Sequence, residues 1–319
     1  MSDDPRDAKS RNPGQLLCDQ VINARIATLR ARATVLERDG VFRQMAKGEL
    51  LEVAPRELIR LNLANKGYLL GLGDSWFDYF AIDVFQSLLN DLGYDGTSVA
   101  EAGTSLKTIA DGAAQLKLLS RELEKTVGGQ MPEAILLSGG GNDLVDFGLE
   151  NLLNVFGSGL PPLIESAVAK LIDQQMAQSL GTILDCITAL CKRWLNKIIP
   201  ILVHGYAYPI PDGRYLIFPR RGPWLEPRFL NRGYDKLDLG PRTAVMKTLI
   251  DRLNSMQLRI AAQPGHEHVR HVDVRTTLAA ADYTTMWANE LHPTSPGFAA
   301  VAGKFDGVLK LLPALKAIP

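Results

Sequence analysis

The chain has 319 residues, of which 46% are hydrophobic, and it carries 35 basic and 35 acidic side chains. That length can bury a substantial core, as one large α/β domain with an appendage or as two domains. A formal net charge of zero argues against a nucleic-acid-binding protein, whose surface needs an excess of lysine and arginine.

The first residues are polar and acidic, and they lack the apolar core of a secretory signal. No uncharged apolar run of about 18 residues is present, so no transmembrane helix is expected. Three cysteines without CxxC spacing, Cys18, Cys186 and Cys191, favour reduced thiols. We therefore expect a cytoplasmic protein and leave open an export route without a cleaved signal.

Residues 1–65 are expected to form an N-terminal helical extension. Apolar residues recur at helical spacing from Leu16 to Val35 and again from Leu50 to Leu63, and arginines line the polar faces. Two interpretations stay open. The extension packs as a helical pair on the main domain, or it docks onto an anionic membrane surface or a partner protein.

From Lys66 onward, apolar runs alternate with helical patterns, which predicts a second domain over residues 66–319. Strands alternating with helices imply a parallel sheet with helices on both faces. The predicted strands are 67–72, 96–100, 133–138, 198–205 and 268–274. The predicted helices are 77–92, 105–125, 241–263 and 296–312.

Two stretches are longer than plain connections. Residues 147–196 predict a strongly apolar helical insertion, and residues 205–240 predict a loop rich in proline, glycine, arginine and aromatic residues. A loop that long in a compact domain is usually functional or disordered, and the aromatic residues argue against disorder. We expect both stretches to form a roof over a site, with simple packing as the alternative.

Ser75 occupies a tight turn between a predicted strand and a predicted helix. Gly71 and Gly73 before it permit the torsions and close approach that such a turn needs. Ligands bind at the carboxyl ends of strands in open α/β sheets, where helix amino ends point at negative charge. Ser75 alone is more often a helix cap, but it is also a candidate nucleophile.

Three later stretches, each following a later strand, favour the nucleophile. Gly103 can present its backbone N–H to an oxyanion, and Asn142, after three glycines, has an amide that can do the same. His292 opens the last predicted helix and is expected at the same edge of the sheet. The glycines do not form a phosphate loop, because no Gly-Lys-Ser/Thr follows. Metal binding by the histidines at 266, 268 and 271 is not favoured by their spacing.

This combination resembles the SGNH, or GDSL-like, serine hydrolase family. Four blocks match in the family's order: Gly73-Asp74-Ser75, Gly103, Gly140-Gly141-Asn142-Asp143 and His292-Pro293. The resemblance implies a flavodoxin-like three-layer α/β/α sandwich with a five-stranded parallel sheet in the order 2-1-3-4-5. It also implies that Ser75 attacks an ester carbonyl, that His292 takes the proton, and that Ser75, Gly103 and Asn142 form the oxyanion hole.

One position departs from the family pattern. Where the family usually has an aspartate three residues before the histidine, this chain has Asn289. An aspartate fixes the imidazole tautomer and stabilises the imidazolium, whereas asparagine supplies no charge. Either Asn289 or a backbone carbonyl orients His292, or Asp282 or Glu290 replaces the aspartate in space.

These observations predict a carboxylic ester hydrolase that uses no metal and no organic cofactor. The apolar roof favours a lipid-like or short acyl ester as substrate, and Trp76, Trp224 and Trp287 are candidate substrate-binding residues. The alternatives are a carbohydrate O-acyl esterase and a binding or effector module that has lost useful catalysis because of Asn289. The oligomeric state is left open.

Overall fold

The computed structural model describes residues 12–38, 66–80, 82–146, 148–215 and 222–316. The strands are β1 (Tyr68–Leu72), β2 (Asp95–Ser98), β3 (Pro132–Leu137), β4 (Ile201–His204) and β5 (Val269–Val272). The longer helices are α1 (Pro13–Arg38), α3 (Val84–Asn90), α4 (Leu106–Gly112), α5 (Ala114–Lys125), α8 (Ala177–Leu195), α10 (Leu239–Ala261) and α11 (Ser295–Lys316). The shorter ones are α6 (Gly141–Asp146), η2 (Leu149–Leu152), α7 (Glu165–Val168), the π-helix η3 (Ala169–Met176), α9 (Glu226–Leu230) and η4 (Tyr283–Thr285).

The five strands form one sheet in the order β2-β1-β3-β4-β5, and every neighbouring pair is parallel. The predicted fold class and strand order are therefore confirmed. The chain leaves β1 toward β2 on one side and returns to β3 on the other, so the strand order reverses at the carboxyl end of β1. Such reversal points form the crevice in which open α/β sheets bind ligands.

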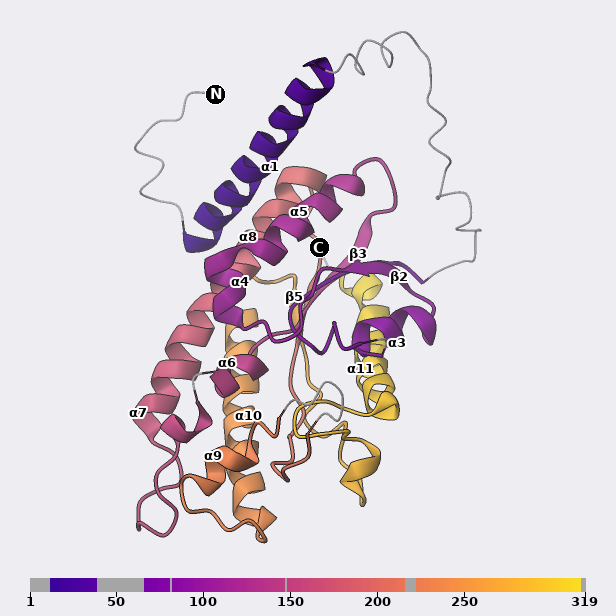
Figure 1. Cartoon of the computed structure of the whole chain (residues 1–319). Coiled ribbons are helices and arrows are strands. Elements are labelled where there is room, and N and C mark those ends of the chain that lie inside the picture. The colour runs from indigo at the N-terminus through magenta and orange to yellow at the C-terminus, as the bar shows by residue number, and fades with distance from the viewer. Residues whose placement is uncertain (1–11, 39–65, 81, 147, 216–221, 317–319) are drawn as a thin grey trace.

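Helices cover both faces of the sheet (Figure 1). On one face α3 packs against α11, and on the other α8 packs against α5 and α10. The central strands β1, β3 and β4 are nearly continuous runs of buried apolar residues, as expected for a parallel sheet covered on both sides. The core thus places the carboxyl ends of β1, β3 and β4 in one rigid row.

The first helix of the N-terminal extension packs on the main domain. Leu17, Cys18, Val21 and Ile22 of α1 are buried, and α1 lies along α8 and α5. A Cβ at Gly14 would lie 2.2 Å from the Cβ of Asp185, so the crossing of α1 over α8 requires a glycine there. The second predicted helix of the extension lies outside the described residues, and membrane or partner docking stays a prediction.

Residues 147–196 are not a single helical insertion. Within the described residues 148–196, η2 and the stretch from Glu165 to Leu195 are helical, and residues 153–164 are a loop with one antiparallel bridge. Along the chain, α8 provides the crossover between β3 and β4 that a parallel pair needs. The added part is therefore the segment before α8.

Two predicted helices begin or continue differently from the expectation. The helix expected from Phe77 begins only at Val84, because the Asp83 side chain caps it by accepting from the Gln86 N–H at 2.8 Å. The helix expected over 105–125 is two helices, since Ala113 takes a left-handed conformation between α4 and α5 (φ 54°). Apolar residues recur at helical spacing on both sides of the two breaks, so the sequence pattern gave no sign of them.

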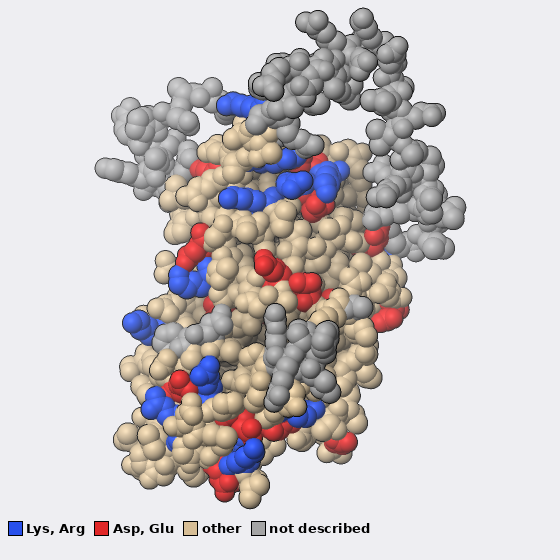
Figure 2. Space-filling view, viewed as in Figure 1, with Lys and Arg blue, Asp and Glu red and all other residues tan. Residues whose placement is uncertain are grey.

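Acidic and basic side chains are interspersed on the face of the molecule in Figure 2. Several basic ones gather near α1 and α5, where Arg25 pairs with Glu124 at 2.6 Å. Among the described residues, no helix is both long enough and apolar enough to span a bilayer.

Candidate active site

The turn after β1 is held by buried polar groups on both sides. The side-chain amide of Gln115 forms two hydrogen bonds with the backbone of Gly73, of 2.7 and 2.8 Å. Gly73 has a φ of 134°, and a Cβ there would lie 2.2 Å from the carbonyl oxygen of Ser138. Only glycine fits this position, which fixes the backbone two residues before Ser75.

Asp74 is the buried centre of this turn. Its carboxylate accepts hydrogen bonds from the Trp76 N–H (3.0 Å), the Ser138 hydroxyl (2.8 Å) and the Tyr206 hydroxyl. Burial raises the pKa of Asp74, and these donors oppose the rise. Asp74 therefore ties the ends of β1, β3 and β4 together beneath Ser75.

Ser75 and His292 meet across the carboxyl edge of the sheet. The Nε2 atom of His292 lies 2.8 Å from the Ser75 hydroxyl oxygen, and its Nδ1 atom lies 3.1 Å from Oδ1 of Asn289. Both side chains are 8% exposed. The structure thus brings together the predicted nucleophile, base and orienting group, although they are up to 217 positions apart in the chain.

The orientation of the Asn289 amide follows from its surroundings. Oδ1 accepts from the backbone N–H groups of Leu291 and His292, each at 3.0 Å, so the oxygen and not the NH₂ faces the imidazole. His292 Nδ1 must then carry the proton and donate it to Asn289. This leaves Nε2 unprotonated and able to accept the proton of Ser75.

The two carboxylates considered as replacements for the missing aspartate make other contacts. Asp282 is exposed and caps η4, accepting from the N–H and hydroxyl of Thr284. Glu290 is buried and accepts from backbone N–H groups of the loop after β4. Within the described residues, the contacts of His292 Nδ1 thus point to Asn289 as the orienting group.

Aromatic rings enclose His292. The Tyr79 ring stacks on the imidazole with centroids 4.2 Å apart, and Trp224 meets it edge-on at 5.8 Å. The Tyr79 hydroxyl also accepts from the Asn289 amide at 3.3 Å. Burial lowers the pKa of His292 to about 3, so the ring is neutral at physiological pH.

The predicted oxyanion-hole groups line the same opening. Asn142 and Gly103 both border the cavity that contains Ser75 and His292. One N–H of the Asn142 amide donates to the carbonyl of Thr104 at 3.0 Å, which fixes the amide and leaves its second N–H. Gly103 has a φ of 85° and is exposed, with open space where a Cβ would be.

Two acidic residues hold the loops near Gly103 and Asn142 and were not singled out as site residues from the sequence. Asp78 accepts from the Ala102 N–H at 2.9 Å and so fixes the turn that carries Gly103. Asp143 accepts from the Leu106 N–H at 2.8 Å at the start of α4, and burial raises its pKa to about 6. For Asp143 the available signal was its place in the matched block Gly140-Gly141-Asn142-Asp143.

The space around Ser75 has two lobes. The open lobe is bordered by Asp78, Tyr79, Phe80, Gly103 and Trp224. The apolar lobe runs inward between α6, η2 and α10, and buried apolar side chains make most of its wall: Leu144, Leu149, Leu225, Met246 and Ile250. Ser75, Asn142 and His292 border both lobes.

The three candidate substrate-binding tryptophans take different positions. Trp76 and Trp287 are buried, pack edge to face at 6.1 Å and line the apolar lobe. Trp224 is half-buried and lines the open lobe next to His292. The structure thus brings all three to the site, two as walls and one as a cover.

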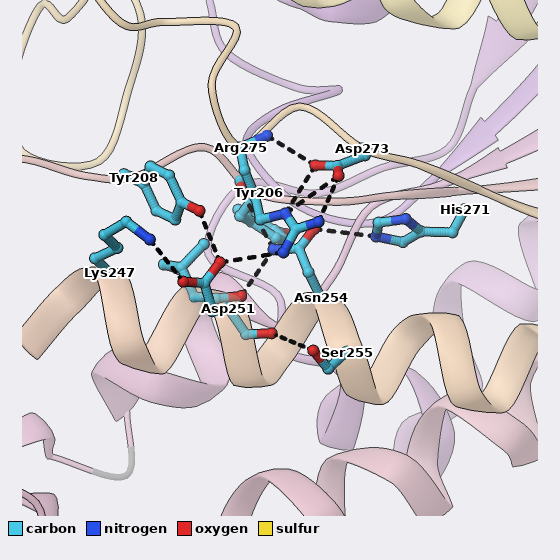
Figure 3. Close-up of polar contacts among 10 residues, drawn as sticks. Tyr206, Tyr208, Lys247, Asp251, Asn254, Ser255, His271, Asp273 and Arg275 are labelled. Carbon is cyan, nitrogen blue, oxygen red and sulfur yellow. Dashed lines mark hydrogen bonds and ion pairs between the residues drawn. The ribbon is translucent and has the colours of Figure 1, made fainter.

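A polar cluster at the carboxyl end of β5 fixes the start of the loop after β4 (Figure 3). His271 donates to Oδ1 of Asn254 at 3.0 Å, and the Asn254 amide donates to the carbonyl of Tyr206 at 3.3 Å. Beside it, Asp251 accepts from Tyr208 at 2.7 Å and from Arg275 at 3.1 Å. This cluster positions Tyr206, whose hydroxyl reaches Asp74.

The histidines considered for metal binding have separate partners. His266 contacts Asp185, His268 contacts Thr188, and His271 contacts Asn254. No group of metal-ligating side chains gathers within the part of the chain that the structure describes.

Solved structures similar to this chain include lipases and an SGNH hydrolase. A lipase from a goat rumen metagenome matches with 14% identity and a TM-score of 0.46, covering 76% of this chain and 96% of the lipase. An extracellular lipase from Streptomyces rimosus matches with 17% identity and a TM-score of 0.46, covering 76% and 99%. A putative SGNH hydrolase from Slackia heliotrinireducens matches with 13% identity and a TM-score of 0.41, covering 76% and 98%.

No family model matches the sequence, and no curated protein matches it significantly. Structural likenesses this distant carry no conclusion about activity. The chemistry must therefore be inferred from the geometry around Ser75.

Proposed function

We propose that the protein is a serine ester hydrolase that acts through an acyl-enzyme on Ser75. One observation carries the proposal, namely the 2.8 Å contact between the Ser75 hydroxyl and Nε2 of a His292 whose Nδ1 is held by Asn289. A hydroxyl within hydrogen-bond reach of an oriented base is the arrangement that nucleophilic catalysis requires.

The reaction proceeds in two halves. Ser75 Oγ attacks the ester carbonyl while its proton moves to His292 Nε2, and the negative charge develops on the carbonyl oxygen. The N–H groups of Ser75 and Gly103 and the Asn142 amide stabilise that charge. His292 then protonates the leaving alcohol, and water, deprotonated by the same nitrogen, releases the acid and restores Ser75.

The acyl group lies in the apolar lobe and the alcohol in the open lobe. Buried leucine, methionine and isoleucine side chains favour a hydrocarbon chain and give a sugar hydroxyl few partners. The substrate is therefore a lipid-like or short-chain acyl ester rather than a carbohydrate O-acetyl ester.

Asn289 favours a second candidate function, a module that binds an ester without useful turnover. A neutral orienting group leaves the imidazolium without a compensating charge, and in a serine protease the change from aspartate to asparagine lowers turnover by about 10⁴. The two functions share one binding site and differ only in rate.

Hydrolysis of p-nitrophenyl esters with acyl chains from acetate to decanoate separates these functions. We expect Ser75-dependent turnover that rises from acetate to a longer chain, because the apolar lobe binds added methylenes. Ser75→Ala is expected to reduce the rate by about 10⁴ or more. Turnover that survives in Ser75→Ala contradicts the serine mechanism.

A phosphonate that mimics the acyl transition state provides the matched test of binding. Wild type is expected to form a covalent adduct on Ser75, identified by peptide mass, and Ser75→Ala none. Non-covalent binding of the ester without adduct or turnover favours the binding module.

A further inference from the structure

Glu290 lies on the turn between Asn289 and His292, but its side chain enters the loop after β4. It is completely buried, with 0% of its surface exposed. Its carboxylate accepts from four backbone N–H groups, those of Gly213 (3.0 Å), Trp224 (2.5 Å), Leu225 (2.7 Å) and Glu226 (2.8 Å).

These four donors lie at the two ends of one long segment, since Gly213 precedes residues 214–223 and the others follow them. One carboxylate therefore joins the two ends of the loop. Only an ionised carboxylate can accept at both oxygens without presenting a hydrogen of its own. An amide at this position turns its NH₂ toward some of the four donors.

The local sequence is fitted to this arrangement. Gly213 has a φ of 82°, and a Cβ there would lie 2.2 Å from the Glu226 carboxylate. Glu226 in turn pairs with the buried Arg242 of α10 at 3.2 Å. The backbone that contacts Glu290 is thus fixed by the positive φ of Gly213 and by the ion pair between Glu226 and Arg242.

The segments that Glu290 holds are walls of the candidate active site. Trp224, whose backbone N–H donates to Glu290, lines the open lobe and packs against the His292 ring. Leu225, bound in the same way, lines the apolar lobe. On the other side of Glu290, the neighbouring Asn289 holds the imidazole.

We propose that Glu290 is a positioning residue for ester hydrolysis, because its carboxylate holds the backbone of residues 224–226 and so keeps the Trp224 ring beside His292 and the base desolvated. The proposal rests on the proposed function for its kinetic consequences. Its structural content, the hold of Glu290 on Trp224 and Leu225 beside the site, does not depend on turnover.

The effect on His292 can be measured because of what faces the ring. Ser75, Tyr79, Asn289 and Trp224 contact it, and none carries a charge at neutral pH. The acids that border the cavity are Asp74 in the apolar lobe and Asp78 in the open lobe. Displacement of Trp224 admits water to the ring, and solvation favours the charged form of the imidazole.

Glu290→Gln is the direct test, with Glu290→Asp as the conservative variant. For Glu290→Gln we expect kcat/KM to fall by about tenfold to a hundredfold. We also expect the acid limb of its pH profile to move upward by about one unit, as the pKa of His292 returns toward its ordinary value. Glu290→Asp keeps the charge and is expected to fall between wild type and Glu290→Gln in both measurements.

Glu150→Gln is the matched control, since Glu150 holds the outer side of the same region. Its carboxylate contacts Arg228 at 3.4 Å and Asn231 at 3.2 Å but none of the four N–H donors of Glu290. It is expected to leave the acid limb in place. A shift of the same size in Glu150→Gln would contradict a specific role for Glu290.

NMR titration of the His292 ring in a Ser75→Ala background separates this proposal from the proposed function. The His292 signal, assigned by its loss in His292→Phe, is expected to titrate at higher pH when Glu290→Gln is added, whether or not wild type hydrolyses esters. An unchanged titration and an unchanged acid limb in a folded Glu290→Gln overturn the proposal.

If Glu290→Gln and Glu290→Asp both fail to fold, hydrogen exchange in the wild-type protein tests the proposal. The amides of Gly213, Trp224, Leu225 and Glu226 are expected to be protected together and to open as one unit. Exchange of these four amides at the rate of exposed loop amides overturns the proposal.

Discussion

The two sides of the candidate active site are built in different ways. The nucleophile side consists of short turns after β1, β2 and β3, which carry Ser75, Gly103 and Asn142. The base side consists of the loop after β4 and the turn before α11, which carry Trp224 and His292. Contacts between residues far apart in the chain hold both sides, but on the first side they converge on strand ends and on the Gly73 torsion, and on the second they converge on the backbone of a loop.

This difference determines what each side tolerates. On the nucleophile side, Gly73 and Asp74 are enclosed by backbone and buried partners, so the geometry is set once the sheet forms. On the base side, several N–H groups converge on one acceptor group. They donate to the amide oxygen of Asn289 and to the carboxylate of Glu290. Substitutions on the first side should change kcat directly. Substitutions on the second side should change the pKa and the orientation of His292.

After the loss of Ser75 itself, the largest effect in this comparison is expected for Asn142→Ala. Its amide is fixed by Thr104 and borders the cavity beside Ser75, so its loss removes one oxyanion donor. We expect kcat to fall by about 10²–10³ with little change in KM. Steady-state kinetics on the best p-nitrophenyl ester measure this.

Asn154→Ala is the control for removing an asparagine from a turn, because Asn154 contacts Pro161 at the exposed end of a loop. Its kcat is expected to stay at the wild-type value. A rise in KM with unchanged kcat for Asn142→Ala would instead assign this residue to substrate recognition.

The nucleophile side could be largely predicted from the sequence. A serine or asparagine among glycines after an apolar run indicates a strand-end turn. Ser75 and Asn142 lie in two such turns, and Gly103 lies in a third turn at the same edge of the parallel sheet. The pairing of His292 with Asn289 could be predicted too, since three residues of separation allow one turn to hold both.

The base side could not be predicted in full. Glu290 appeared as a substitute for the missing aspartate, yet its partners lie up to 77 positions away and are backbone groups with no sequence signature. The stacking of Tyr79 on His292 was also missed, because the helix expected from Phe77 placed Tyr79 on a regular helix. Contacts of this kind depend on the folded path of a loop.

Asn289→Asp tests the base side with a gain of function. The new carboxylate keeps the three N–H donors now bound by Oδ1, and its second oxygen accepts from the Tyr79 hydroxyl. A negative charge beside Nδ1 favours the imidazolium that forms in the transition state. We expect kcat to rise by about tenfold or more, within the 10⁴ that the reverse change costs in a serine protease.

The pH profile separates this variant from Glu290→Gln. An opposite charge raises the pKa of His292, so in Asn289→Asp the acid limb moves to higher pH while kcat increases. In Glu290→Gln, displacement of Trp224 moves the limb in the same direction but decreases kcat/KM. A large loss of activity in Asn289→Asp would show that another group orients the base.

The smallest effect, a change in thermal stability, is expected for a substitution of His204 at the end of β4. This ring is fully buried between Trp76, with centroids 4.7 Å apart, and Phe305, which stacks on it at 5.7 Å. Among the described residues neither ring nitrogen has a hydrogen-bond partner, and burial lowers its pKa to about 3. His204→Phe is therefore expected to keep or slightly raise the melting temperature at pH 7.5, because an unpaired polar group is replaced by an apolar ring of similar shape.

The sign of the pH dependence follows from the lowered pKa. His204 binds a proton in the unfolded chain below about pH 6.5 but not in the folded one, so wild type loses stability as the pH falls from there toward 3. The variant lacks this loss, and its advantage should grow by about 1 kcal/mol on going to pH 5.5. His266→Phe is the opposite control, since Asp185 raises the pKa of His266 and its contribution is largest at low pH. Thermal unfolding of the three proteins at both pH values measures this, and a His204→Phe variant that loses stability at pH 5.5 relative to wild type would show that the buried imidazole has a partner that stabilises it.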